Sequence, residues 1–131
     1  MSTLNFPNGA GFDLSALKDL VIDQIVLRRH QINFILSDDG AAHVGTIVLE
    51  GDISIDGNDE SHRYGIANAE GCIPGVLLGV HIEGASYERL KLLSIRLQHG
   101  WVLTGMSPQT GEEFGIIRVS RGAIQFLLPL I

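Results

Sequence analysis

Residues 52–62 carry the densest group of side chains in this sequence that could bind a metal ion. The group offers carboxylate oxygens, which hard cations prefer, together with one imidazole nitrogen. Its members are Asp52, Asp56, Asp59, Glu60 and His62. Their spacing does not match a calcium-binding loop, and we expect Asp52 and Asp59 to leave the chain on different turns. The sequence therefore predicts a solvated hairpin tip and no metal site.

Nucleophilic catalysis has no recognisable basis in the sequence. The Gly-x-Ser-x-Gly, Walker, Rossmann and His-Glu-x-x-His motifs are all absent. No two histidines stand at a chelating i, i+2 or i, i+4 spacing; they are His30, His43, His62, His81 and His99. Cys72 is the single cysteine, has no histidine beside it in the sequence and is expected to be a small buried hydrophobic residue. We predict no catalytic residues, no cofactor and no enzymatic activity.

The composition is typical of one globular domain in a reducing compartment. A chain of 131 residues that is 45% hydrophobic can bury a core without disulfides. The N-terminus has neither the basic start nor the apolar core of a signal peptide. The longest apolar stretches are too short to span a bilayer. These features predict a single domain over residues 1–131 that is cytoplasmic and has no membrane partner.

The acidic side chains are concentrated in one region. The net charge is −6, and residues 38–60 contain seven acidic side chains but neither lysine nor arginine. They are Asp38, Asp39, Glu50, Asp52, Asp56, Asp59 and Glu60. A nucleic acid partner would need a basic surface that this region lacks, whereas a basic protein surface suits it. We predict these seven as partner-binding residues; the alternative is an acidic solvated edge that only keeps the protein in solution.

Alternation of apolar and polar residues predicts β-strands in two similar places. It runs through residues 32–36 into an Asp-Asp-Gly turn that ends at Gly40. It runs again through residues 93–97 into a His-Gly turn that ends at Gly100. In the first of these strands we expect Ile32, Phe34 and Leu36 to face inward because they share one side of a period-2 pattern.

The alternation in these two segments predicts the fold class. We expect a mainly β protein in which two pseudo-repeated antiparallel hairpin or meander units form one sandwich or partly open barrel. The units are residues 13–67 and 73–128, and the second repeats the pattern of the first with low sequence identity. A short N-terminal helix capped by Asp13 precedes the first strand. Further strands are predicted over residues 21–29, 42–55 (with a bulge or bend at Gly51), 62–67, 114–120 and 123–128.

The C-terminal segment ends in apolar residues and is a candidate interface. Ile124, Phe126 and Leu128 would face one way on a strand. Leu127 and the last two residues, Leu130 and Ile131, are not accounted for by that face. Those remaining residues either fold back on the core or meet another chain. We therefore predict a possible homodimer, with the interface formed by Ile124, Phe126, Leu128, Leu130 and Ile131.

The two-half arrangement resembles a family of small uncharacterised bacterial β proteins of similar length. The similarity is carried by Leu17-x-x-Leu20-Val21 with residues 34–40 in the first half, and by residues 77–80 with 95–101 in the second. It covers most of residues 14–128, and an acidic-aromatic signature follows the last turn as Glu112-Glu113-Phe114. The resemblance implies no catalytic residues. Small acidic proteins of this kind are similar to cognate inhibitors of bacterial toxins.

Three functions follow from these patterns. The first is a non-enzymatic acidic protein-binding module, an immunity or inhibitor-type protein that neutralises a basic partner. The second is a structural or homo-oligomeric β module that uses the apolar C-terminal strand. The third is a small-ligand-binding or hydrolytic β domain whose pocket draws on His81, His99, Trp101 and Glu112. For Trp101 itself we expect packing in the core, and the alternative is an anchor in an interface.

Overall fold

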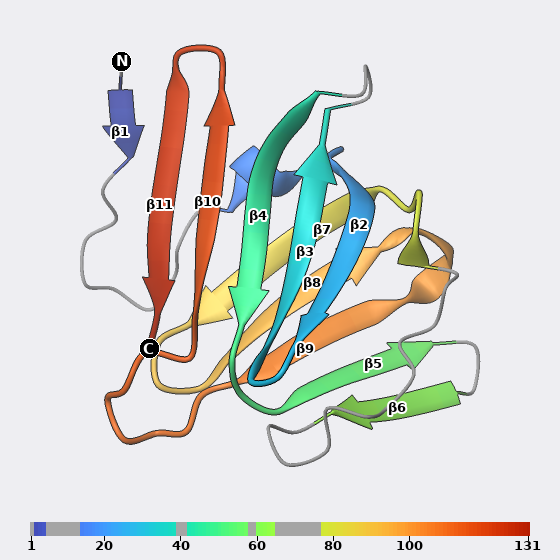
Figure 1. Cartoon of the computed structure of the whole chain (residues 1–131), viewed down its shortest axis with the longest axis vertical. Helices are drawn as coiled ribbons and strands as arrows, with labels where there is room; N and C mark the ends of the chain where they lie inside the picture. Colours follow the sequence, from blue (N-terminus) through green and yellow to red (C-terminus); the bar gives the residue numbers. More distant parts are fainter. Residues whose placement is uncertain (1, 5–13, 39–41, 58–59, 65–76) are drawn as a thin grey trace.

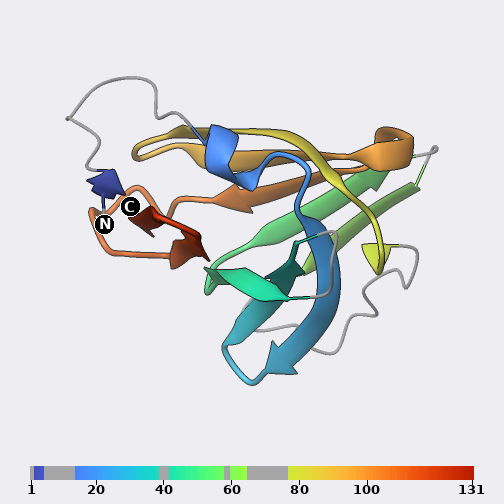
Figure 2. The same cartoon turned by 90° about the horizontal axis from the view of Figure 1, so that it is seen from above.

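The computed structural model describes residues 2–4, 14–38, 42–57, 60–64 and 77–131, and these form two β-sheets packed face to face (Figure 1, Figure 2). Sheet A contains, in spatial order, β1 (Ser2–Leu4), β11 (Ile124–Leu130), β10 (Gly115–Arg121), β4 (His43–Leu49), β3 (Gln31–Ser37) and β2 (Val21–Arg28). Sheet B contains β6 (Glu60–Tyr64), β5 (Ile53–Gly57), β9 (Val102–Met106), β8 (Leu92–Leu97) and β7 (Ile82–Glu88). Turns of 3-10 helix include η1 (Ser15–Leu17) and η4 (Gln98–Gly100).

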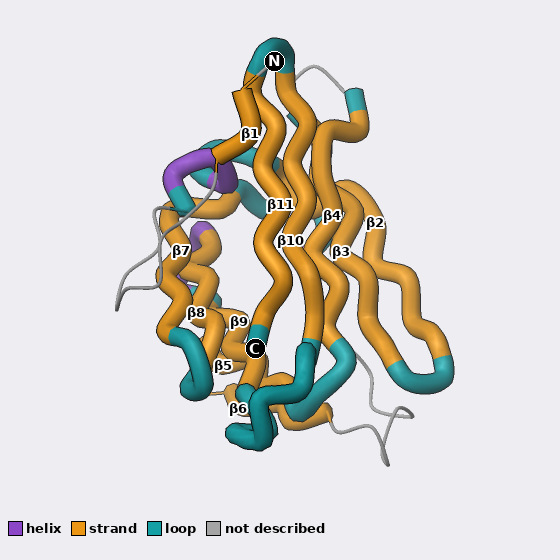
Figure 3. The backbone as a smooth tube through the Cα atoms, turned by 90° about the vertical axis from the view of Figure 1, so that its left-hand side faces the viewer, coloured by secondary structure: helices purple, strands orange, loops and turns teal. Residues whose placement is uncertain are grey.

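The prediction of a mainly β fold is confirmed, and the architecture is a sandwich. All pairings within the two sheets are antiparallel except that of β1 with β11, which is parallel. Among the described strands, none closes either sheet into a barrel. Figure 3 shows the strands of sheet A side by side in one layer, with most of sheet B to their left. No helix in this described part is long and apolar enough to cross a membrane.

The predicted N-terminal helix is wrong, because only the 3-10 turn η1 forms there. Leu14 and Leu17 are buried, and their spacing of three residues suits one turn of a 3-10 helix as well as an α-helix. Lys18 then takes an extended conformation and ends the turn. The predicted cap, Asp13, lies outside the described residues.

The single strand predicted over residues 42–55 is two strands in different sheets. β4 belongs to sheet A and β5 to sheet B, and Glu50, Gly51 and Asp52 cross between them. The alternation continues through the crossing because Leu49 and Ile53 both point into the shared core. A Cβ on Gly51 would lie 3.1 Å from a backbone oxygen of Met106, so a glycine permits this close crossing. The predicted bend is therefore correct and the predicted continuity is not.

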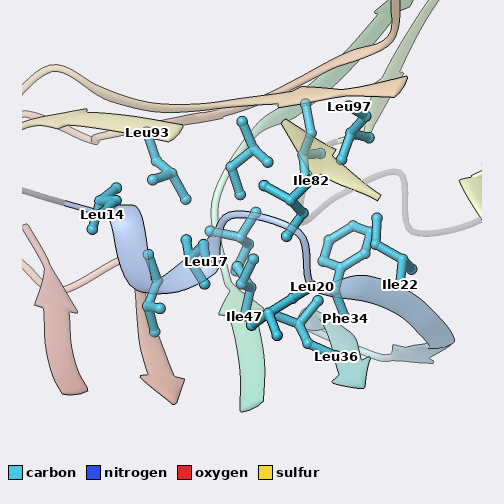
Figure 4. Packing of buried hydrophobic residues seen from close by; sticks show 14 of the residues in the cluster. Leu14, Leu17, Leu20, Ile22, Phe34, Leu36, Ile47, Ile82, Leu93 and Leu97 are labelled. Carbon is cyan, nitrogen blue, oxygen red and sulfur yellow. The ribbon is translucent and has the colours of Figure 1, made fainter. Parts of the chain in front are cut away.

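The core lies between the two sheets, and the β3 side chains in it are the ones that the alternation predicted to face inward. Ile32, Phe34 and Leu36 are buried, and Figure 4 shows Phe34 and Leu36 beside leucines of the η1 region and Ile82 of the opposite sheet. Trp101 is only 4% exposed and belongs to the same cluster, so it packs in the core as expected.

The two sheets meet at one corner through a short contact whose hydrogen bonds are reciprocal. The Ile22 amide donates to the Val80 carbonyl at 3.0 Å, and the Ile82 amide donates to the Leu20 carbonyl at 2.8 Å. From this corner β2 pairs with β3 and β7 pairs with β8. In each hairpin the strand register shifts directly after the isoleucine of this corner, Ile22 in β2 and Ile82 in β7. The corner fixes how the two hairpins are oriented relative to each other.

The predicted C-terminal interface is wrong for the residues that lie in the core. Phe126, Leu128 and Leu130 are buried against sheet B and cannot meet another chain. Ile131 is partly buried, because its backbone is bonded to Tyr87 of β7. For Ile124 the structure describes the backbone in β11 but not the side chain. The segment folds back on the core, which was one of the two outcomes expected for its last residues.

The Tyr87 hydroxyl holds this end of the chain. It donates to the Ile131 carbonyl at 2.9 Å and accepts from the Ile131 amide at 2.7 Å. We expect Tyr87→Phe to lower the free energy of unfolding by about 1–3 kcal/mol, since it leaves a buried network without its hydroxyl. Urea denaturation followed by circular dichroism measures the change. Tyr87→Phe with unaltered stability would show that water replaces the hydroxyl without loss.

Several predictions fall on residues that the structure does not describe. They concern the partner-binding residues Asp39 and Asp59, the buried position of Cys72, and the end of the strand over residues 62–67, of which β6 covers the first three. These remain predictions.

Candidate functional site: an acidic groove at the sheet crossing

Glu50 and Asp52, two of the predicted partner-binding residues, flank Gly51 where the chain passes from sheet A to sheet B. Beside this crossing lies a groove of about 320 Å³. Three separate segments of the chain line it: residues 50–52, 106–108 and 112–114. The groove therefore exists only when β4, β9 and β10 are assembled.

Backbone hydrogen bonds fix the three segments relative to one another. The Glu50 amide donates to the Phe114 carbonyl at 2.8 Å, and the Met106 amide donates to the Asp52 carbonyl at 3.0 Å. The Phe114 amide in turn donates to the Leu130 carbonyl of β11 at 2.8 Å. These bonds extend the ladders of both sheets to the rim, so the groove is part of the rigid scaffold.

The third segment is positioned by the turn after β9. The Ser107 hydroxyl accepts from the Gln109 amide at 3.0 Å, and the Thr110 hydroxyl accepts from the Glu112 amide at 3.3 Å. Hydroxyls that cap nearby amides in this way stabilise tight turns. Gly111 has a φ of 85°, a conformation that favours glycine. The turn directs the chain so that Glu112 and Glu113 reach the rim of the groove.

Four carboxylates line the groove. Glu50, Asp52, Glu112 and Glu113 are all exposed. Within the part of the chain that the structure describes, none of them forms an ion pair. The same described part holds no cluster of three or more His, Cys, Asp or Glu side chains that could bind a metal ion. The groove is consequently a negative surface suited to cationic side chains.

Lys91 lies next to this surface but its charge is engaged elsewhere. The Ser107 amide donates to the Lys91 carbonyl at 2.9 Å, while the Lys91 ammonium contacts the Glu88 carboxylate at 2.9 Å. The hydrogen bond and charge of Glu88 raise the pKa of Lys91 above its ordinary value. Among the described residues the ammonium is therefore paired with Glu88 and with no carboxylate of the groove.

Comparison with known proteins gives no relative. No family model, curated protein or solved structure matches this chain. The resemblance to small two-half bacterial proteins therefore remains a hypothesis, and the site must be interpreted from its own chemistry.

The other predicted acidic residues do not join the groove. Asp38 lies beyond the opposite end of β4 and forms an ion pair with Arg121 at 3.4 Å. Asp56 lies on β5 and accepts hydrogen bonds from the Ser54 and Ser61 hydroxyls at 3.1 and 2.6 Å. Glu60 starts β6, and its side chain is not described. The acidic run in the sequence is therefore split between separate places on the fold.

Glu112 and Glu113 complete the groove but were not among the predicted partner-binding residues. They follow a turn some sixty residues from Glu50 in the sequence, so only the pairing of β10 with β4 reveals their proximity. The available signal was the acidic-aromatic signature after the last turn, which named them without linking them to Glu50 and Asp52.

The residues predicted for a small-ligand pocket are divided among different environments. His81 Nδ1 lies 3.0 Å from Gln98 Oε1, and His99 occupies the exposed turn of η4 with a φ of 64°. Trp101 packs in the core and Glu112 lines the acidic groove. Elsewhere, His43 Nε2 lies 2.7 Å from Asp23 Oδ2 on sheet A. These positions give the third functional hypothesis no support.

Proposed function

We propose that this protein is a non-enzymatic binding module that holds a basic segment of a partner protein in the acidic groove. One observation carries the proposal: four carboxylates from separate chain segments line one groove and form no ion pair with the described residues. The proposed biological setting is a bacterial immunity or inhibitor-type protein that neutralises a basic partner in the cytoplasm. Electrostatic attraction of this kind accelerates encounter, which favours rapid neutralisation.

The groove also has an apolar component that suits lysine and arginine. Met106 is 41% exposed and Pro108 is exposed, and both line the groove with the carboxylates around them. Lysine and arginine have long apolar stems below their charged ends. A basic side chain can therefore pack its stem against Met106 and Pro108 while its cation reaches a carboxylate.

Affinity capture with matched charge variants tests the proposal. The groove variant combines Asp52→Lys, Glu112→Lys and Glu113→Lys. The control combines Asp19→Lys, Asp23→Lys and Glu83→Lys, which reverse three exposed carboxylates outside the groove, change the net charge by the same amount and leave the Glu88–Lys91 ion pair intact. Purified wild-type protein and both variants are immobilised, and proteins retained from the source organism's lysate are compared by mass spectrometry.

We expect the wild-type protein and the control to retain one basic partner that the groove variant loses. Equal retention by all three proteins would contradict the proposal, because the groove would then be unnecessary. Loss of retention by the control as well would also contradict it, since the attraction would then be due to net charge alone.

We also propose that the two halves are repeats of one structural unit that differ where the groove has formed. Asp19 and Gly79 support this, because their amides donate to the carbonyls of Ile82 and Ile22, each at 2.8 Å. The two residues share a positive φ, of 69° and 80°. On this view the shared unit builds the fold, and the acidic crossing and turn provide the binding function.

Substitutions at this matched pair test the repeat. We expect Gly79→Ala to lower the free energy of unfolding by about 1 kcal/mol, because a Cβ is strained at positive φ. No atom lies within 4 Å of that Cβ, so a clash does not contribute. Asp19→Gly should leave stability within about 0.5 kcal/mol, since it relieves strain and adds unfolded-state entropy. A large loss from Asp19→Gly in thermal denaturation would show that the positions are not equivalent.

A further inference from the structure

A second pocket lies beside β7, at the edge of sheet B. It has a volume of about 340 Å³ and is lined by residues of the η1 region, by residues 83–85 of β7 and by Arg96 of β8. Figure 2 shows η1 beside β7. The Asp19 amide, just after η1, donates to the Ile82 carbonyl at 2.8 Å and fixes this region against the strand. The pocket is therefore built from parts that backbone hydrogen bonds hold together.

Two cationic side chains from different elements line this pocket. Lys18 follows η1 and Arg96 lies on β8. Both side chains are exposed, and neither forms an ion pair within the residues that the structure describes. Glu83 is the one carboxylate among the lining residues, so the lining is positive overall. Because the whole chain has a net charge of −6, this local excess of positive charge is unusual, and we call the site the cationic pocket.

Gly84 allows the Arg96 guanidinium to lie across β7. The two residues are opposite each other in the register of β7 and β8. A Cβ on Gly84 would overlap with Arg96 Nη2 and would lie 3.0 Å from its Cζ. Any side chain at this position would therefore displace the guanidinium from the strand. The glycine thus helps to place the charge of Arg96 at the cationic pocket.

The corresponding positions in the β2–β3 hairpin hold no cation. Leu78 corresponds to Lys18, because each directly precedes a residue of positive φ whose amide bonds to the strand of the other sheet. Ile35 corresponds to Arg96, because each faces the residue that directly follows the register shift of its hairpin. The same local geometry therefore forms with leucine and isoleucine. Since the fold does not require the two cations, we attribute them to a ligand.

We propose that the cationic pocket binds a small phosphomonoester that also carries hydroxyl groups. A phosphomonoester has a charge of about −1.5 to −2 at neutral pH, which suits a pair of cations better than a single carboxylate does. A guanidinium binds phosphate through two parallel hydrogen bonds, and a lysine adds a point charge. An ionised Glu83 only accepts hydrogen bonds, so it repels a second anionic group and pairs with a hydroxyl.

The walls of the cationic pocket suit a ligand of the size of a sugar phosphate. Its volume of about 340 Å³ is near the lower end of the range for small-molecule sites, roughly 300–1,000 Å³. Leu14 is buried and Ala85 is partly buried, and they add apolar surface on which the carbon skeleton of a ligand can rest. Such a ligand is anionic, so its site is separate from the one proposed for a basic partner.

Nuclear magnetic resonance titration of the labelled full chain with ribose 5-phosphate tests the proposal. Ribose lacks the phosphate and inorganic phosphate lacks the hydroxyls, so they serve as comparison probes. We expect ribose 5-phosphate to shift the amides of Ser15, Glu83 and Gly84 with a dissociation constant on the order of 1 mM. Inorganic phosphate should bind at least about threefold more weakly, and ribose should cause no shift. Unshifted amides at about 10 mM ribose 5-phosphate, or equal affinity for any two probes, would overturn the proposal.

Variants of matched charge show whether the cationic pocket is responsible. The pocket variant combines Lys18→Leu and Arg96→Ile, the residue types found at the corresponding positions of the other hairpin. The control combines Arg28→Leu and Arg89→Ile, which remove two exposed cations outside the pocket. Gly84→Ala is a further variant that keeps both charges and displaces the guanidinium. Circular dichroism verifies that each variant is folded, and Gly84→Ala decides if the pocket variant is not.

We expect the control to bind ribose 5-phosphate within about twofold of the wild-type protein, and the pocket variant at least about tenfold more weakly. Gly84→Ala should weaken binding at least about threefold. Equal weakening in the pocket variant and the control would overturn the proposal, since net charge alone would then attract the ligand. Wild-type affinity in Gly84→Ala would overturn the role of Arg96. All these variants leave the acidic groove intact, so their results do not bear on its basic partner.

Discussion

Replacing Phe34 by alanine is expected to lower the free energy of unfolding by about 3–5 kcal/mol. The Phe34 side chain is fully buried on β3, where it faces the core opposite Ile25 of β2 and Ile47 of β4. Removing the ring loses its burial and leaves a cavity that two packed sheets cannot close. Because domains of this size are stable by about 5–15 kcal/mol, this one change threatens folding.

Urea denaturation measures this loss. Trp101 is the only tryptophan and is buried, so its fluorescence reports the unfolding of the core. Leu78→Ala serves as the control at a half-exposed leucine, with an expected change within about 0.5 kcal/mol. If Phe34→Ala cost less than about 1 kcal/mol, β3 could not occupy the centre of the sandwich.

Reversing the charge of the acidic groove is expected to weaken partner binding by at least about 100-fold. Asp52→Lys, Glu112→Lys and Glu113→Lys convert three attractive contacts into repulsive ones on the same surface. Like charges brought together at an interface cost several kcal/mol. Folding should be unaffected, because all three side chains are exposed and form no ion pair within the described residues.

Isothermal titration calorimetry with the captured partner measures the affinity, and repeating it at several salt concentrations separates charge from shape. Wild-type affinity should fall as salt rises, since screening weakens exposed charge contacts. The control reversal of Asp19, Asp23 and Glu83 should bind within about threefold of the wild-type protein. An affinity independent of salt would exclude the carboxylates as the source of binding.

The local alternation of residues predicted most of the strands. In β3 and in the β10–β11 pair, one side of each strand is buried, so the period of two is strong. The same pattern wrongly predicted one continuous strand through Gly51. The alternation continues through the crossing because β4 and β5 face one core from different sheets. A pattern of burial carries no information on which sheet a strand joins.

The acidic groove could be predicted only in part. Glu50 and Asp52 are adjacent to the bend that the sequence revealed, whereas Glu112 and Glu113 join them through the pairing of β4 with β10. The spacing of neighbouring residues in the sequence does not reveal which distant strands pair or in which register.

The C-terminal strand shows a second limit of the same kind. Periodicity groups Phe126 and Leu128 correctly on one face, but the choice of which face meets the core depends on sheet B. The structure buries Phe126 and Leu128 and leaves Leu127 outside.

Nuclear magnetic resonance titration of isotopically labelled protein with its basic partner tests the central claim most directly. We predict that the largest shifts in the backbone amides lie at Gly51, Asp52, Ser107, Glu112 and Glu113, around the groove. The amides near Asp38 and Asp56, the acidic residues outside the groove, should remain unperturbed. Shifts centred on Asp38 or Asp56, with the groove unchanged, would contradict the proposal that the groove is the binding site.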